Sequence, residues 1–261
     1  MKKFLYIILI LIICAAVFVA VKPASKPESV NNEGYLSYPH NTSSFTEGLF
    51  FYNGQLYESM GPYEKSAVYK NIDINSGVPE ASYRFEDDIF AEGSVVFYNK
   101  LYVLTYKENK AFIFDPDTLE LLDTLNYPRD GWGLTTDGEY LIASDGSSSL
   151  FYLDEELQLI KTLDIFYNGE PIDNINELEY INGLIWANIW RQDFIVIIDP
   201  ATGNVLEVID FGDILPVNLF EDDANDVLNG IAYDPAEDRV YITGKYWPLM
   251  FSFARSSLYD N

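Results

Sequence analysis

Residues 176–190 read Asn-Glu-Leu-Glu-Tyr-Ile-Asn-Gly-Leu-Ile-Trp-Ala-Asn-Ile-Trp. Two apolar runs, rich in β-branched and aromatic residues, flank Asn182-Gly183, a dipeptide that favours the positive φ angles of a two-residue turn. The pattern predicts a β-hairpin that begins with a polar cluster at Asn176 and ends at Trp190, 14 residues later. The rest of the chain repeats this hairpin with other residues at its first and last positions.

The repeats are best aligned on the residue at the head of each hairpin. The five heads are Glu47, Glu92, Trp132, Asn176 and Asn229, and they are separated by 45, 40, 44 and 53 residues. After each of the first four hairpins comes a third strand ending at an Asp turn, such as Asp115-Pro116-Asp117-Thr118, and then a fourth strand. Four short strands in a repeat of this length are typical of β-propeller blades. We therefore predict an all-β, five-bladed propeller over residues 34–261.

The fifth repeat is one strand short, because its third strand, Met250–Phe253, lies close to the end of the chain. Gly34–Tyr38, near the other terminus, has the composition of a strand and precedes the first head. We predict that this segment supplies the missing outer strand, because closing the ring removes the exposed edges that an open sheet would present.

Residues 1–33 differ from the repeats. Lys2 and Lys3 precede an apolar run from Phe4 to Val21, which is about 18 residues, short for a membrane span and long for a signal-peptide core. We interpret residues 1–22 as a signal peptide or an uncleaved membrane anchor, and residues 23–33 as a linker. The basic flank places the remaining chain across the membrane, so we expect an exported domain, secreted or anchored, that contacts the membrane only through this segment.

Composition excludes several classes of function. The net charge of −25 argues against nucleic acid and anionic membrane surfaces as partners, although it suits cationic ligands such as peptide amino termini, or simply solubility. Cys14 is the only cysteine and His40 the only histidine, so a Ser-His-Asp or Cys-His nucleophile and a His-rich metal site are excluded. Acid–base and electrostatic catalysis by Glu and Lys is what remains.

The innermost strand of each propeller blade faces the central channel, so equivalent positions of the five blades converge at one mouth. The heads form one such ring, and the residues 14 positions later form a second one, Gly61, Tyr106, Gly146, Trp190 and, after a longer turn, Lys245. Carboxylates, carboxamides, a lysine and large aromatics at one mouth indicate a binding site. Simpler roles are also open: Asn229 could be a turn residue, Trp132 a plug of the channel, and the two glutamates the ligands of a structural calcium ion.

In order along the chain, these motifs resemble the plant and bacterial type of glutaminyl-peptide cyclotransferase (glutaminyl cyclase). The matching runs are Phe45-Thr46-Glu47-Gly48-Leu49, Ala91-Glu92-Gly93, Asp130-Gly131-Trp132-Gly133-Leu134-Thr135, Asn176-Glu177-Leu178-Glu179-Tyr180, Ala187-Asn188-Ile189-Trp190 and Thr243-Gly244-Lys245. The resemblance covers about residues 35–253. It implies a five-bladed propeller that converts N-terminal glutamine of peptides and proteins to pyroglutamate with release of ammonia. It implies no required cofactor and allows a structural calcium ion in the central channel.

The resemblance also implies roles for individual residues. Glu92 is expected to carry the proton between the α-amine and the leaving nitrogen, while Lys245 and Asn176 hold and polarise the carboxamide. The implied substrate-binding residues are Trp132, Trp190, Tyr106, Phe45 and Glu47, with the two tryptophans as pocket walls and the last two residues at the mouth. No metal-binding residue is predicted.

Two departures from the family pattern bear on this expectation. Tyr106 replaces an expected Trp, which keeps an aromatic wall and adds a hydroxyl, and Ala91 replaces a Gly. An alternative reading is a non-catalytic exported propeller that binds peptides or proteins, and Tyr106 is the best argument for it. A calcium-dependent sugar-lactone hydrolase would need more central carboxylates and typically six blades. We expect a monomer that acts on N-terminal-glutamine peptides or proteins.

Overall fold

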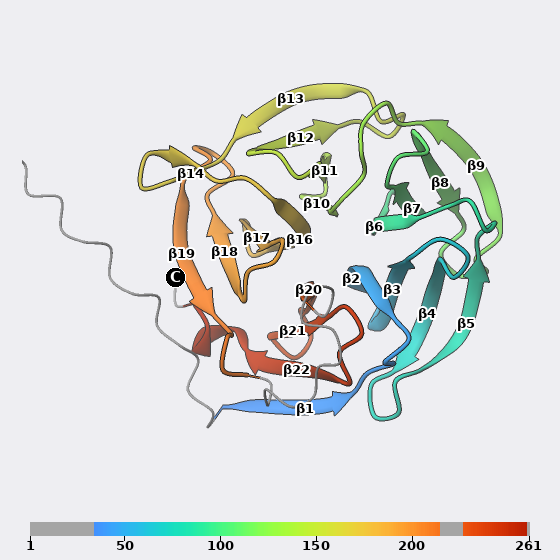
Figure 1. Cartoon of the computed structure of the whole chain (residues 1–261), viewed down its shortest axis with the longest axis horizontal. Coiled ribbons are helices and arrows are strands. Elements are labelled where there is room, and N and C mark those ends of the chain that lie inside the picture. Colours follow the sequence, from blue (N-terminus) through green and yellow to red (C-terminus); the bar gives the residue numbers. More distant parts are fainter. Residues whose placement is uncertain (1–33, 215–226, 260–261) are drawn as a thin grey trace, which may run out of the picture.

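The computed structural model describes residues 34–214 and 227–259, and these form a ring of five blades around a central channel (Figure 1). Each blade is a four-stranded antiparallel sheet whose first strand lies innermost. In chain order the blades are β2 (Phe45–Tyr52), β3 (Gln55–Gly61), β4 (Ala67–Asp73) and β5 (Val78–Arg84); β6 (Ala91–Phe97), β7 (Lys100–Thr105), β8 (Lys110–Phe114) and β9 (Leu121–Asn126); β10 (Leu134–Thr136), β11 (Leu141–Ala143), β12 (Ser149–Leu153) and β13 (Leu159–Asp164); β16 (Ile175–Ile181), β17 (Leu184–Ile189), β18 (Phe194–Ile198) and β19 (Val205–Asp210); and β20 (Leu228–Asp234), β21 (Arg239–Gly244), β22 (Leu249–Ala254) and β1 (Tyr35–Pro39).

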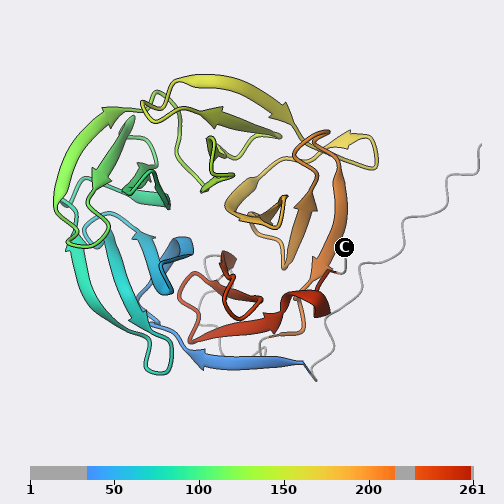
Figure 2. The same cartoon turned by 180° about the vertical axis from the view of Figure 1, so that it is seen from behind.

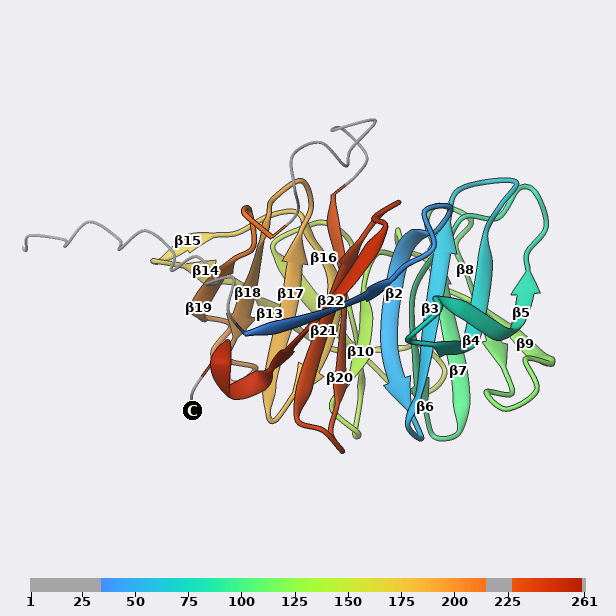
Figure 3. The same ribbon diagram turned by 90° about the horizontal axis from the view of Figure 1, so that it is seen from below.

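The ring closes through the two ends of the described chain. Strand β1 pairs antiparallel with β22, from Tyr35 opposite Phe253 to Pro39 opposite Leu249, and forms the outer edge of the fifth blade. Seen from behind and edge-on (Figures 2 and 3), the blades pack side by side into a thick disc, and the short hairpin β14 (Phe166–Tyr167) and β15 (Glu170–Pro171) projects beside the fourth blade. The predicted closure is confirmed, with the strand one residue later than expected.

Burial follows the position of a strand within its blade. Inner strands such as β6 are buried along almost their whole length, because each blade packs against two neighbours and the channel. Outer strands such as β9 expose most of their side chains. Large aromatics join the blades: the hydroxyl of Tyr57 donates to Pro116 O at 3.0 Å, and that of Tyr102 donates to Glu155 O at 3.1 Å, each in the next blade. These two tyrosines therefore fill the spaces between blades while keeping their hydroxyls hydrogen-bonded.

The inner strands are irregular at the heads. In β2 the register shifts between Thr46 and Gly48, and equivalent β-bulges occur between Ala91 and Ser94, between Ile175 and Leu178 and between Leu228 and Ile231. In the third blade both Trp132 N and Gly133 O bond to Ser144, at 3.2 and 3.0 Å, just before β10. A bulge reorients the side chain it carries, so all five heads leave the regular pleat at the same end of the ring.

Glycine follows most heads because neighbouring inner strands come very close there. A Cβ on Gly133 would lie 2.1 Å from Asn176 O, and one on Gly93 would lie 2.5 Å from Trp132 O. The fourth blade is different: its head is followed by Glu177, whose side chain enters the channel. The carboxylate accepts from Ile231 N at 2.8 Å and, in a longer contact, from Leu49 N at 3.4 Å.

The sequence-based fold is confirmed in class, blade number and strand order. The predicted signal peptide or anchor (1–22) and the predicted linker (23–33) lie outside the described residues. Within residues 34–214 and 227–259, no helix is long and apolar enough to cross a membrane.

Candidate functional site

The two predicted rings meet at one end of the channel, where the same backbone hydrogen bond recurs in three blades. Tyr106 N donates to Phe90 O at 3.0 Å, Trp190 N to Asn174 O at 2.8 Å and Lys245 N to Val227 O at 2.9 Å. Each bond joins the residue that ends a hairpin to the residue two positions before that hairpin's head. The 14-residue spacing therefore places heads and hairpin ends side by side.

Glu47, Glu92 and Lys245 form a buried charged group at this mouth. Lys245 Nζ lies 2.8 Å from Glu47 Oε1, and Asn229 Nδ2 donates to Glu47 Oε2 at 3.2 Å and to Thr46 O at 2.8 Å. Glu92, the head of the next inner strand, is also buried, and its carboxyl and that of Glu47 interact electrostatically. Lys245 also lies over the Phe45 ring, 4.4 Å from its centroid, so its charge is held by both an anion and a π face.

The protonation of this group follows from burial and from charge. Burial, and then the neighbouring charge of Glu47, raise the pKa of Glu92 well above its ordinary value of 4.5, and Lys245 offsets part of this effect. Burial raises the pKa of Glu47 as well, against the opposing effects of Lys245 and of the hydrogen bond with Glu92. Lys245 contacts Glu47 directly, and the pKa of Glu92 is raised further than that of Glu47.

Two tryptophans lie beside this group and pack edge to face. The ring centroids of Trp132 and Trp190 are 5.8 Å apart at 80° between planes. Gly146 makes room for Trp132, since a Cβ there would lie 2.7 Å from the indole, and its φ of +80° is one that side chains rarely adopt. The sequence placed Gly146 only among the hairpin ends, and the structure shows that it makes room for the tryptophan side chain.

A second aromatic group lines the seam between the first two blades. Phe90 contacts Phe45, Tyr63 and Tyr106, with centroid distances of 6.1, 5.3 and 5.6 Å, and Phe45 also packs against Tyr246 at 5.1 Å. Phe90, Tyr63 and Tyr246 are absent from the predicted site. Two of them could have been found, because Phe90 and Tyr246 flank predicted residues in an aromatic context.

Asn176 is buried at the bulge of β16, and its carbonyl oxygen accepts from Ser144 Oγ at 2.7 Å. Its side-chain amide has no hydrogen-bond partner among the described residues, and is available for a ligand carboxamide. All predicted site residues thus belong to the mouth region, while Glu47 is already bound to Lys245 and Asn229.

Glu177 and Glu179 are two further buried carboxyls in the channel that the site prediction omitted. Burial raises the pKa of both, that of Glu179 to about 8. Their oxygens already accept hydrogen bonds from Leu49 N, Ile231 N and Tyr233 N. Among the described residues no group of three or more His, Cys, Asp or Glu is arranged to hold a metal.

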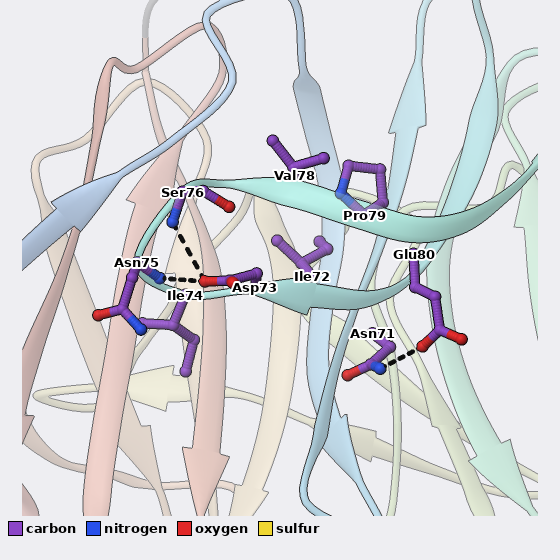
Figure 4. A pocket seen from close by; sticks show the side chains of 9 residues that line it. All are labelled: Asn71, Ile72, Asp73, Ile74, Asn75, Ser76, Val78, Pro79 and Glu80. Carbon is purple, nitrogen blue, oxygen red and sulfur yellow. Dashed lines mark hydrogen bonds between the residues drawn. The ribbon is translucent and has the colours of Figure 1, made fainter.

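A surface depression lies over the hairpin that joins β4 to β5, away from the predicted residues (Figure 4). Its lining is the hairpin itself, in which Asp73 Oδ1 accepts from Asn75 N at 2.8 Å and from Ser76 N at 3.2 Å. These bonds account for the polar groups as turn structure, and the mouth of the channel is the better candidate site.

Comparisons with known proteins agree with the resemblance seen in the sequence. Residues 7–254 match the family model described as glutamine cyclotransferase. The chain is 36% identical over 218 residues to a glutaminyl-peptide cyclotransferase of Arabidopsis thaliana, covering 82% of this chain and 68% of the relative. It is also similar to the crystal structure of Myxococcus xanthus glutaminyl cyclase, with a TM-score of 0.76 and 33% identity, covering 87% of this chain and 97% of that one.

Proposed function

The chain belongs to the glutamine cyclotransferase family, and we propose that it converts the N-terminal glutamine of peptides and proteins to pyroglutamate with Glu92 as the acid–base residue. The observation that carries the assignment of Glu92 is its buried carboxyl, with a pKa raised well above its ordinary value by burial, beside the ion pair of Glu47 and Lys245 at an aromatic mouth. Such a carboxyl can both give and take a proton near neutral pH.

The reaction begins with the α-amine of the substrate, which attacks only as the neutral amine. A substrate that arrives as an ammonium ion gives one proton to the carboxylate form of Glu92. A substrate that arrives as the free amine meets Glu92 already protonated, and the two routes lead to the same complex. The amine then attacks the γ-carboxamide carbon of the same glutamine and closes a five-membered ring.

The carboxamide oxygen gains negative charge in this step. We place it near Lys245 Nζ and the Asn176 amide, because fixed donors in a buried site stabilise developing charge with little reorganisation. Lys245 Nζ contacts one oxygen of Glu47 at 2.8 Å and has further donors to offer. Asn176 has a side-chain amide without a partner among the described residues.

Ring closure is completed when the C–N bond of the carboxamide breaks. Glu92 gives its proton to the leaving nitrogen and takes one from the attacking nitrogen, so that ammonia leaves and Glu92 is protonated again. Trp132 and Trp190 wall the glutamine side chain and keep water from the carbonyl, with Tyr106 on the neighbouring wall. Phe45 and Glu47 close the mouth, the first through its ring and the second through its contact with Lys245. This chemistry needs no cofactor.

We further propose that this reaction takes place outside the cytoplasm, on a monomer. The support is the N-terminal sequence, in which two lysines precede the apolar run from Phe4 to Val21. The segment serves as a signal peptide or an anchor, and the catalytic domain contacts the membrane through it alone.

The test is ammonia release from a Gln-initiated dipeptide by the full-length chain, compared with Glu92→Gln. The amide keeps the shape of the side chain and cannot exchange protons, so we expect a loss of about 10²–10⁴-fold in kcat/KM. Glu179→Gln is the matched control and should keep full activity. A folded parent without turnover on several such peptides would contradict the proposal and favour a non-catalytic peptide binder.

A further inference from the structure

Glu47 is placed unlike a residue that contacts substrate. It is 1% exposed, and it lies at the bulge of β2, where the register shifts between Thr46 and Gly48. One oxygen contacts Lys245 Nζ at 2.8 Å and the other contacts Asn229 Nδ2 at 3.2 Å. Glu92, the buried head of the next inner strand, completes its surroundings.

Two neighbouring carboxyls can hydrogen-bond to each other only if one of them is protonated, because two carboxylates have acceptors only. Two ionised carboxyls this close would also repel each other strongly when buried. One cation, Lys245, contacts the pair directly. One shared proton therefore leaves one negative charge to balance one positive charge, and the three residues together are neutral.

We propose that Glu47 is a positioning residue that, together with Lys245 and Asn229, holds the Glu92 carboxyl in a pair sharing a single proton. The inference deepens the proposed function and rests on it for its catalytic meaning. Glu47 remains the anion bound to Lys245, so the proton resides on Glu92, where the reaction needs it. The shared proton also orients Glu92, because its O–H must point toward Glu47 until substrate displaces it.

The remaining ionisable groups near the pair are few. Facing it from the surrounding elements are Glu108 on the β7–β8 loop, Glu177 in the channel and Tyr63 on the β3–β4 loop, together with Lys245. A negative charge on Glu108 adds to the preference of Glu92 for a proton.

The experiment compares the parent chain with Glu47→Gln. Glutamine keeps the length of the side chain and can still contact Asn229 and Lys245 with its oxygen, but it carries no charge. Glu92 then loses its anionic neighbour and keeps the lysine. The limb of the kcat/KM pH profile that reports Glu92 should move to lower pH by about one to three pH units. The limb set by the amine of the same peptide should not move.

Infrared difference spectra provide a second measurement that needs no turnover. Near neutral pH the parent should contain one more protonated carboxyl than either Glu47→Gln or Glu92→Gln, because each variant leaves a single carboxylate beside Lys245. Glu179→Gln is the control and should leave the pH profile unchanged.

The outcomes separate this inference from the proposed function. Two results for Glu47→Gln would overturn the shared proton while leaving the cyclotransferase activity intact. One is a lower rate with an unshifted kcat/KM pH profile, and the other is an infrared spectrum that keeps the protonated carboxyl lost in Glu92→Gln. If the parent shows no turnover but its spectra contain a protonated carboxyl that is absent from both variants, the proposed function is contradicted and the shared proton is supported.

Discussion

Glu179 offers a prediction whose size follows from its surroundings. This residue is 9% exposed and lies in the channel, where burial raises the pKa of its carboxyl to about 8 from an ordinary value of 4.5. The folded protein thus binds a proton that the unfolded chain has lost between these two pH values, and folding stability falls as pH rises through that interval. At about 1.4 kcal/mol for each unit of pKa difference, the loss contributed by Glu179 is at most about 5 kcal/mol.

Glu179→Gln removes this loss. Glutamine resembles the protonated acid: its oxygen can still accept from Tyr233 N, as Glu179 does at 3.0 Å. We expect the variant and the parent to melt together at pH 5. At pH 9 the variant should be more stable, and even a third of the maximum would raise Tm by roughly 3–7 °C for a domain of this size.

The assay is thermal unfolding by circular dichroism at pH 5, 7 and 9. The matched control is Glu58→Gln, the same exchange at a buried carboxyl that contacts the imidazole of His40, Nε2 at 3.2 Å. That variant should be destabilised. A Glu179→Gln variant whose Tm differs from that of the parent by the same amount at every pH would refute the reasoning.

The other predictions concern the site and the seam of the ring. Gly146→Ala should lower kcat/KM by roughly 10²-fold by displacing Trp132, whereas Gly169→Ala, which has a similar φ of +85° but nothing within 4 Å of its Cβ, should not; equal activities would contradict the packing described here. Tyr106→Trp, which restores the family's aromatic wall, should raise kcat/KM several-fold at an unchanged Tm, worth about 1 kcal/mol of added contact; a fall would show that the hydroxyl is used. For His40, burial alone lowers the pKa but Glu58 and Trp247 O raise it above 6.5, so the ion pair stabilises the fold below that pH and its contribution is lost as pH rises through the raised value. His40→Asn should accordingly destabilise by about 3–5 kcal/mol at pH 6 in urea unfolding, with a smaller difference at pH 9; the reverse trend would assign His40 a neutral role.

The propeller could be predicted from sequence because its unit is local. Each blade repeats the same hairpin and Asp turn, and a spacing of 14 residues from Asn176 to Trp190 places both at one end of the ring. The same periodicity located Lys245 and Glu92 without knowledge of any contact. The closing strand could be predicted by counting strands. The last repeat contains only three, and a ring without an exposed edge needs a fourth strand from elsewhere in the chain.

What the sequence could not provide are the contacts between side chains of different blades. The β-bulges set the direction of each head side chain, and the residues around Glu47 contain no pattern that predicts a bulge. The contact between Glu47 and Lys245 joins residues 198 positions apart. The His40 side chain likewise lies between Glu58 and Trp247 O, which are 18 and 207 positions away.

Positions next to a predicted residue were missed for another reason. Glu177 occupies the place where the other blades have glycine, and only the placed blades show that its carboxyl accepts from Ile231 N and Leu49 N. Phe90 was passed over because its role depends on Gly61, where a Cβ would lie 2.4 Å from the phenyl ring. A small residue of one blade that makes room for a large residue of another can be recognised only in the three-dimensional structure.

The most direct test of the proposed activity is mass spectrometry of peptides incubated with the purified full-length chain. Three peptides that differ only in their first residue, Gln, Glu or Asn, would be compared at neutral pH. The proposed function predicts that the Gln peptide loses the mass of one ammonia and its free amine, at a rate that Glu92→Gln abolishes, while the other two are unchanged. A Gln peptide that binds but keeps its mass would contradict a catalytic role for this site.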